Sequence, residues 1–193
     1  PIIGLGLAHE AAPRELKPGH GHGAAVAVDG TLACATAPVL ITAAPPFIPG
    51  LAGLYRRDER GLWRSVATLT AGNDYLDRFG TSVALRVPWL AIGATGNGTV
   101  SIWSLDSEGT PSPSAEIITG PQQVTWFGHA TRLSADRLVV SAPLADGEGV
   151  DEGRVYVWRR DGAQWVAEAT LAAPSPQAGS RFGWSLALNE EGT

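Results

Sequence analysis

The chain has 193 residues, of which 44% are hydrophobic and 17% charged, and this is enough for one globular domain with a core rather than a disordered chain. The formal net charge of −5 and the scattered basic residues exclude a nucleic-acid-binding surface, which needs clustered Lys and Arg. The most apolar stretch, Val39 to Leu54, is interrupted by prolines and is shorter than the roughly 20 residues that span a bilayer, so we expect no membrane insertion within this segment.

A short motif that ends in glycine opens four segments of the chain. In chain order the motif reads His22-Gly23, Phe79-Gly80, Phe127-Gly128 and Phe182-Gly183. A triplet of small residues follows the first three glycines, always at the same distance, as Thr36-Ala37-Pro38, Gly93-Ala94-Thr95 and Ser141-Ala142-Pro143. The period is roughly 50 residues, and self-similarity at such a period is the signature of a repeat architecture.

Each repeat continues with two more strand-like segments, the first of which begins at a glycine. The pairs are Gly53–Tyr55 and Val66–Leu69, Gly98–Trp103 and Ala115–Ile118, and Gly153–Trp158 and Ala169–Leu171. Four short strands per repeat, separated by Gly, Pro, Asn and Asp, are typical of a propeller blade. We therefore predict an all-β fold made of β-propeller blades of four antiparallel strands, with three complete blades and the start of a fourth. The repeats are expected at approximately 17–72, 73–121, 122–175 and 176–193.

The residues that recur in these motifs predict architectural roles. A Phe before a Gly supplies a bulky anchor beside a residue that is free to adopt a positive φ. The second strands are expected to contain Cys34, Ala94 and Ala142 in equivalent places, and the single cysteine is interpreted as a small core residue. The structural positions of the repeat are Gly23, Phe79, Gly80, Phe127, Gly128, Ala142, Pro143, Phe182 and Gly183.

With these motifs the chain resembles the FG-GAP repeat family, which is named for its Phe-Gly and Gly-Ala-Pro signatures and occurs in integrin α-subunits and in bacterial surface or secreted proteins. The resemblance extends from about Lys17 to Thr193, with a degenerate first repeat. It implies a seven-bladed ring of which this chain is a fragment, at an extracellular or cell-surface location. It also implies a non-catalytic interaction module that recognises protein or glycan through propeller loops.

Integrin-type repeats carry an Asp-rich calcium loop between the first and second strands, and this chain departs from that pattern. The equivalent positions are Val28–Thr31, Arg86–Trp89 and Leu133–Arg137, which are too short and too poor in oxygen ligands for a calcium site. The chain therefore resembles the shorter bacterial type without calcium loops. No cofactor is expected, and calcium stays an alternative that the usual loop motif does not support.

One loop nevertheless concentrates carboxylates in the third repeat. Asp146, Glu148, Asp151 and Glu152 are oxygen ligands of the kind that hard cations prefer, and they are the weak candidates for a metal site. Their spacing departs from an EF-hand, and acidic glycine-rich hairpin loops are commonly only solvated. The solvated loop is therefore the competing interpretation.

The insert Pro38 to Ala52 is a candidate recognition loop, since loops on a rigid scaffold often bind partners. The competing interpretation is that it folds back over a neighbouring blade. His20, His22 and His129 do not form a zinc site by sequence, because zinc takes three or four clustered ligands. No nucleophile motif, phosphate loop or recurrent carboxylate pair occurs, so no catalytic residue is predicted. Alternatives to a binding module are the propeller portion of a larger secreted enzyme and a purely structural surface repeat.

Overall fold

The computed structural model describes residues 23–38, 49–71, 75–121 and 125–189. In these ranges it consists of β-strands with one short 3-10 helix, η1 (Tyr75–Asp77). Within them, no helix is long and apolar enough to cross a membrane. The all-β class predicted from the sequence is confirmed.

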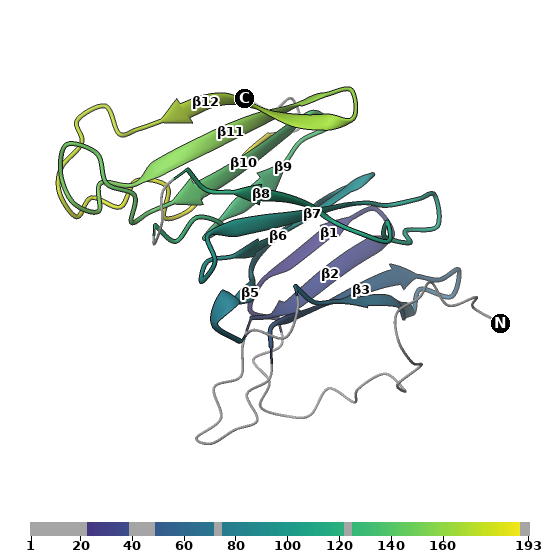
Figure 1. Ribbon diagram of the computed structural model, residues 1–193. Helices are drawn as coiled ribbons and strands as arrows, with labels where there is room; N and C mark the ends of the chain where they lie inside the picture. The colour runs from purple at the N-terminus through teal and green to yellow at the C-terminus, as the bar shows by residue number, and fades with distance from the viewer. Residues whose placement is uncertain (1–22, 39–48, 72–74, 122–124, 190–193) are drawn as a thin grey trace, which may run out of the picture.

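Three four-stranded antiparallel sheets follow one another along the chain, and we call them blades 1, 2 and 3 (Figure 1). Blade 1 consists of β1 (Val26–Asp29), β2 (Leu32–Ala37), β3 (Leu51–Arg57) and β4 (Trp63–Leu69). Blade 2 consists of β5 (Phe79–Arg86), β6 (Trp89–Ala94), β7 (Thr99–Ser104) and β8 (Glu116–Thr119). Blade 3 consists of β9 (Thr131–Leu133), β10 (Arg137–Ala142), β11 (Arg154–Asp161) and β12 (Gln164–Leu171). Every strand pairs with the strand that precedes or follows it in sequence.

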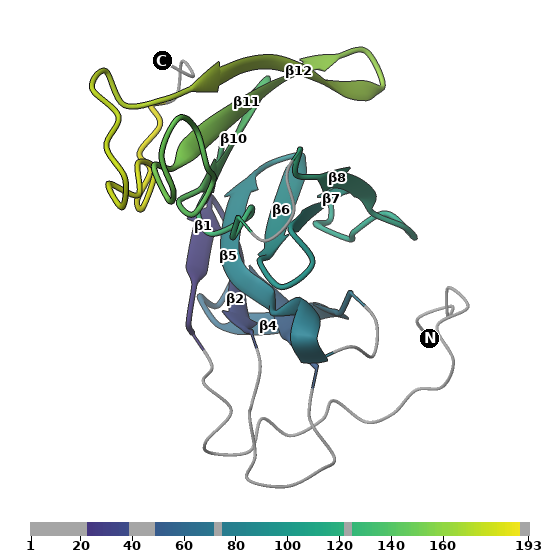
Figure 2. The ribbon, with the colours of Figure 1, turned by 60° about the vertical axis from the view of Figure 1, so that its left-hand side comes forward.

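The blades are stacked with their first strands closest together (Figures 1 and 2). β5 contacts β1 and β2 of blade 1, and β9 contacts β5 and β6 of blade 2. The outer strands β4, β8 and β12 make no comparable contact between blades in the described part of the chain. The sheets therefore crowd together at their inner edges and splay outward, which is the arrangement of a β-propeller. This arrangement explains why the first two strands are rich in Ala, Gly and Ser.

Two apolar clusters join the blades. The cluster between blades 1 and 2 includes Cys34, Leu54 and Phe79, and all three side chains are fully buried. The cluster between blades 2 and 3 is centred on Phe127, which is also fully buried. Burial in an apolar surrounding raises the pKa of the Cys34 thiol to about 12. The interpretation of Cys34 as a core residue is confirmed.

The predicted equivalence of Cys34 with Ala94 and Ala142 is wrong in one respect. All three residues lie in second strands, but only Ala94 and Ala142 end their strands, opposite Thr99 and Arg154 respectively. In blade 1 this place is taken by Ala37, opposite Leu51. The distance from the repeat glycine, which is the same for all three alanines, gives the correct alignment.

Two predicted segments differ from the structure at their edges. Leu51 and Ala52, expected in the insert, belong to β3, and residues 39–48 lie outside the described residues. In the predicted fourth repeat, the described residues up to Asn189 contain no strand. A first strand pairs with the second strand of its own blade, and the described part of the chain offers no such partner to this segment.

Candidate functional site

The up-and-down course of the strands gives the stack of blades two ends. At the first end, which we call the Phe-Gly end, first and third strands begin and second and fourth strands end. Its described segments are 23–25, 38, 49–50, 70–71, 75–78, 95–98, 120–121, 125–130, 143–153 and 172–184. At the opposite end, which we call the hairpin end, short connections join the strands. Its segments are 30–31, 58–62, 87–88, 105–115, 134–136 and 162–163.

The Phe-Gly motif forms the same turn three times at the Phe-Gly end. In each turn the residue before Phe and the Gly itself have positive φ, and the amide after the Gly donates to the carbonyl of the residue before Phe. The φ angles are 53° and 93° for Arg78 and Gly80, 54° and 89° for Trp126 and Gly128, and 51° and 85° for Arg181 and Gly183. Three non-glycine residues in a left-handed conformation at equivalent places indicate that the surroundings impose this turn.

Packing against the preceding blade explains the Phe and the Gly. Phe127 contacts both blades that it joins. Its ring centre lies 5.6 Å from that of Trp158 in blade 3. On the side of blade 2, a Cβ added to Gly120, which follows β8, would lie 2.6 Å from the Phe127 side chain. A Cβ added to Gly128 would lie 2.9 Å from the carbonyl oxygen of Thr99 in blade 2. Such a contact is too short for any side chain, so a glycine is required there.

The remaining sequence-predicted repeat positions lie in the same region. Gly23 has a φ of 78°, and its amide donates to the Thr36 carbonyl at 2.9 Å. Ala142 and Pro143 are fully buried at the end of β10. Phe182 is partly buried, and its amide donates to the Glu152 carbonyl at 2.8 Å.

The turn fixes the backbone but leaves two side chains free to vary, the one before Phe and the one after Gly. They are Arg78 and Thr81 in the first turn, Trp126 and His129 in the second, and Arg181 and Trp184 in the third. All six are at least partly exposed. The second and third turns therefore present aromatic and basic side chains at the Phe-Gly end.

Three of these side chains form an aromatic cluster, which consists of Trp126, His129 and Trp184. The His129 ring lies 5.8 Å from Trp126 at an interplanar angle of 22°, and 4.7 Å from Trp184. The two indoles are 6.2 Å apart. The Arg181 guanidinium lies 5.7 Å from the Trp184 ring centre, close enough for a cation–π contact. Two successive turns thus build one surface.

Burial between the indoles lowers the pKa of His129, and a hydrogen bond to the Trp184 backbone opposes this shift only in part. The imidazole is therefore neutral at pH 7, and it acts as a third flat ring. Trp184 is 49% exposed, so the cluster is not a closed core. The sequence does not predict this cluster. Aligning the residues that flank each Phe-Gly pair shows aromatic side chains in the second and third turns, but not that these side chains meet.

The acidic loop, residues 146–153, holds the third Phe-Gly turn in place through backbone hydrogen bonds. The carbonyls of Val150, Asp151 and Glu152 accept hydrogen bonds from the amides of Gly179, Arg181 and Phe182 at 2.8 to 3.0 Å. In both ribbon views this loop, between β10 and β11, lies beside the segment that follows β12 (Figures 1 and 2). The loop therefore helps to position the segment that carries Arg181 and Trp184.

Two carboxylates of the acidic loop bind groups within the loop and at the start of β11. Glu152 is buried, accepts the Gly149 amide at 2.6 Å, and pairs with Arg154 at 3.0 Å. Asp146 accepts the Asp151 amide at 2.9 Å. Among the described residues no three His, Cys, Asp or Glu side chains are grouped as metal ligands. This includes the four candidates Asp146, Glu148, Asp151 and Glu152.

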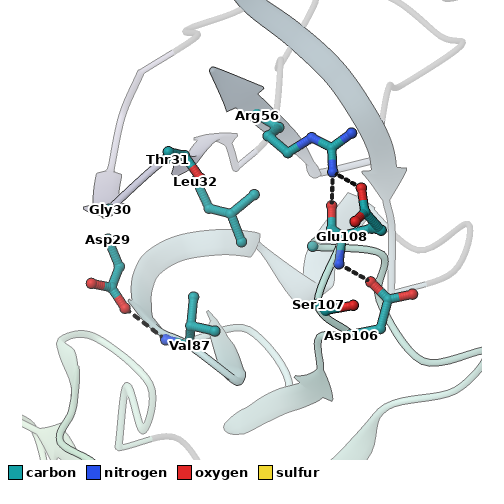
Figure 3. Close-up of a pocket in the computed structure, with 10 residues that line it drawn as sticks. Asp29, Gly30, Thr31, Leu32, Arg56, Val87, Asp106, Ser107 and Glu108 are labelled. Atoms are coloured by element: carbon teal, nitrogen blue, oxygen red, sulfur yellow. Dashed lines mark hydrogen bonds and ion pairs between the residues drawn. The ribbon is translucent and has the colours of Figure 1, made fainter. Parts of the chain in front are cut away.

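The hairpin end contains a cavity of about 260 Å³ between blades 1 and 2 (Figure 3). Arg56 donates to the Glu108 carbonyl at 3.0 Å and forms an ion pair with the Glu108 carboxylate. Asp29 accepts the Val87 amide at 2.7 Å, and Asp106 accepts the Glu108 amide at 2.9 Å. The bonds of Arg56 to Glu108 and of Asp29 to Val87 cross from blade 1 to blade 2 and brace the blades here, whereas the bond between Asp106 and Glu108 lies within the connection that follows β7.

His20 and His22, which are potential metal ligands by residue type, lie outside the described residues. Asp77 is buried, and its carboxylate accepts the Phe79 amide at 2.8 Å, so it stabilises the first turn.

Comparison with known proteins supports the fold. No protein-family model matches the chain, and no curated protein matches it. Among solved structures, a proposed 6-phosphogluconolactonase from Bacteroides uniformis matches 79% of this chain with a TM-score of 0.55 and 15% identity. A protein from Lactobacillus plantarum matches 80% of the chain with a TM-score of 0.51 and 17% identity. The chain spans 44% and 42% of the lengths of these two structures. At such identities the likeness shows the fold alone, and the chain is an arc of β-propeller blades.

Proposed function

We propose that the chain is a non-catalytic binding module, which recognises protein or glycan through the Phe-Gly end of its blades. The observation that carries this proposal is the aromatic cluster with the adjacent Arg181. Trp, Tyr and Arg are the residues that dominate binding energy at interfaces. Here two tryptophans, a neutral imidazole and a guanidinium converge from two successive turns onto a partly exposed surface.

The finer assignment, to an extracellular or cell-surface protein of the FG-GAP type, is part of the proposal. It is supported by the three Phe-Gly turns, which share one backbone conformation and one hydrogen bond although their flanking residues differ. Support for a non-catalytic role comes from the surroundings of His129. In the described residues its imidazole lies between indoles, and no hydroxyl, thiol or carboxylate forms a hydrogen bond with it that would make a catalytic pair. The activity in the name of the Bacteroides uniformis protein is not transferred at 15% identity.

Replacing the exposed indole tests the proposed function. Trp184→Ala and a matched control, Trp63→Ala, each remove one exposed tryptophan, and Trp63 begins β4 next to the hairpin end. We expect the wild type to bind members of an array of glycans and extracellular proteins. Trp184→Ala should lose about tenfold or more in affinity for those ligands, and Trp63→Ala should keep it. Binding by Trp184→Ala equal to that by Trp63→Ala would refute a site at the Phe-Gly end, and a wild type that binds nothing on the array would favour a purely structural repeat.

A further inference from the structure

We infer that two copies of this chain associate through the face of blade 1 that is turned away from blade 2. We call it the Val-Trp face, and all four strands contribute to it. Its residues are Val26, Val28, Ala33, Ala35, Tyr55 and Trp63. The inference goes beyond the proposed function and does not depend on it. It is carried by the exposure of this face, by comparison with the same face of blades 2 and 3, and by the sizes of its side chains.

The alternation of side chains along the strands defines this face. Cys34 and Leu54 point toward blade 2, where they belong to the apolar cluster between the blades. Their neighbours in sequence, Ala33, Ala35 and Tyr55, point the other way, because successive residues of a strand lie on opposite faces. Residues paired across strands share a face, which adds the two valines of β1 and the tryptophan of β4.

The inner part of this face is exposed in blade 1 but buried in blade 2. Val26 and Val28 are each 59% exposed. Val83 and Leu85 follow their repeat glycine at the same distances, and they are only 5% and 8% exposed, because they pack against blade 1. The valines of β1 thus occupy positions that a neighbouring sheet covers elsewhere in the fold.

The outer part of the face shows the same contrast. Trp63 and Trp165 lie near the start of the fourth strand of their blades, each opposite an arginine of the third strand. Trp165 is 8% exposed, and its ring centre lies 5.7 Å from that of Trp89 in the preceding blade. Trp63 is 46% exposed. An apolar stripe across a whole sheet is therefore left uncovered in blade 1, and such a surface is typical of a protein interface.

The centre of the face is shallow. Ala33 follows its repeat glycine at the same distance as Leu90 and Leu138 follow theirs, and both leucines are fully buried against the preceding blade. Ala35 is likewise smaller than its two equivalents in β6 and β10. Whatever covers the Val-Trp face must therefore supply large side chains over the two alanines, because a void there would forfeit packing contacts.

Head-to-tail stacking of two copies does not meet this requirement without a conflict. The far face of blade 3 is the other blade face that no described strand covers, and the third Phe-Gly turn already occupies part of it. A Cβ added to Gly183 would lie 2.7 Å from Val155 in β11. Gly23 is the equivalent of Gly183 in blade 1, so a second copy of blade 1 stacked there would compete with this turn for the same place.

The same face of a second copy supplies the missing bulk. The strands lie in the order β1-β2-β3-β4, so a two-fold axis along the strands, between β2 and β3, places β2 of each copy over β3 of the other. Ala33 and Ala35 then receive Tyr55 of the second copy, and the valines of β1 meet its Trp63. Small residues of each face lie opposite large residues of the other, which is the self-complementarity that a symmetric dimer needs.

The size of the face sets the strength of this dimer. Four strands that are about 4.8 Å apart and about 20 Å long form a face of about 400 Å². A standard interface buries about 800 Å² per partner, so we expect a reversible dimer with a dissociation constant of about 10 μM.

Sedimentation velocity of the full chain tests this inference at concentrations from about 1 to about 100 μM, on both sides of the expected dissociation constant. The wild type should change from monomer to dimer over this range. Val28→Asp should raise the dissociation constant about tenfold or more, because it would bury a charge in the interface. The matched control is Val150→Asp, which changes a valine that is 66% exposed in the acidic loop, and it should dimerise as the wild type does.

A second variant tests the fit of the alanines. Ala33→Leu introduces the residue that β6 and β10 carry at this place, so a blade accommodates it. In the proposed dimer the new side chain would collide with Tyr55 of the second copy, and the dissociation constant should rise about tenfold or more. This variant keeps the inference testable if Val28→Asp does not fold, which circular dichroism and the thermal midpoint at about 1 μM, below the expected dissociation constant, would reveal.

Three results would overturn the inference. A wild type that is monomeric at all concentrations would mean that this face binds no second copy. Dimerisation that persists in Val28→Asp and Ala33→Leu would place the contact on another surface. Tighter association of Ala33→Leu, or growth beyond the dimer, would indicate that the face stacks on a different blade face rather than on itself.

Discussion

Shortening Phe127 should uncouple blades 2 and 3, and Phe182 provides a control at the equivalent repeat position. The Phe127 ring is fully buried and lies 5.7 Å from Tyr156 and 5.6 Å from Trp158. Complete truncation of such a ring costs about 3–5 kcal/mol, a large part of the about 5–15 kcal/mol that stabilises a typical domain. Phe127→Leu keeps most of the volume, so the protein should remain folded with a loss of about 1–2 kcal/mol.

Thermal and urea unfolding measure this loss. For a chain of this size, 1 kcal/mol shifts the thermal midpoint by about 2–4 °C, so Phe127→Leu should lower it by about 2–8 °C. The urea midpoint should fall without a change in the m-value. Phe182 is only partly buried and lies in a segment without strands, so Phe182→Leu should cost less than about 1 kcal/mol. Equal shifts in the two variants would refute the claim that Phe127 joins the blades.

Three further predictions concern single residues. Gly128→Ala should lower the free energy of unfolding by about 3 kcal/mol through strain and overpacking, because its φ is 89° and the new Cβ would meet the Thr99 carbonyl. In the same urea assay the control Gly162→Ala, whose Cβ would meet nothing within 4 Å, should lower it by about 1 kcal/mol. Since burial raises the pKa of the Cys34 thiol to about 12, a disulfide reagent at pH 8 should react with this thiol only in denaturant. Rapid reaction in the native state would mean that blade 1 opens. Hydrogen bonds from the Leu62 amide and from the Arg64 side chain lower the pKa of Asp58. The ionised carboxylate should therefore stabilise the fold above the usual aspartate range, and this effect should be lost as the pH falls through the lowered pKa. An NMR titration midpoint of Asp58 at or above the usual value would contradict this.

The sequence predicted the fold because the repeat constrains it in several independent ways. Phe79 and Phe127 recur with a following glycine, and small residues recur at a fixed distance after that glycine, so both the inner strands and their order could be predicted. The position of Cys34 shows that residue type alone is a poor guide to alignment. Cys34 and Ala37 both lie in a second strand, but the distance from the repeat glycine identifies Ala37 as the equivalent of Ala142, and the strand pairing agrees.

The site was harder to predict, since its residues share no motif. By residue type His129 is a potential zinc ligand, yet its neighbours in space are Trp126 and Trp184. Trp184 belongs to the next repeat, and only the stacking of successive turns brings it within 4.7 Å of His129. The acidic loop could not be assigned from sequence either. Its four carboxylates are weak metal candidates by type, while in the structure Glu152 is buried against Arg154 and backbone carbonyls of the loop bind the third turn.

The Phe-Gly turn separates the residues that hold the fold from those that can change for function. Phe and Gly are fixed by burial and by close backbone contacts, as at Phe127 and Gly128. The residues on either side of the pair are held in one conformation by the same hydrogen bond, but their side chains leave the packed interface. They can therefore differ between repeats within the same turn, as Arg78 and Trp126 do at equivalent positions with φ angles of 53° and 54°. Because successive turns lie side by side, variation at these positions creates a composite surface without altering a strand. This is the physical reason for seeking the ligand of the chain at the Phe-Gly end.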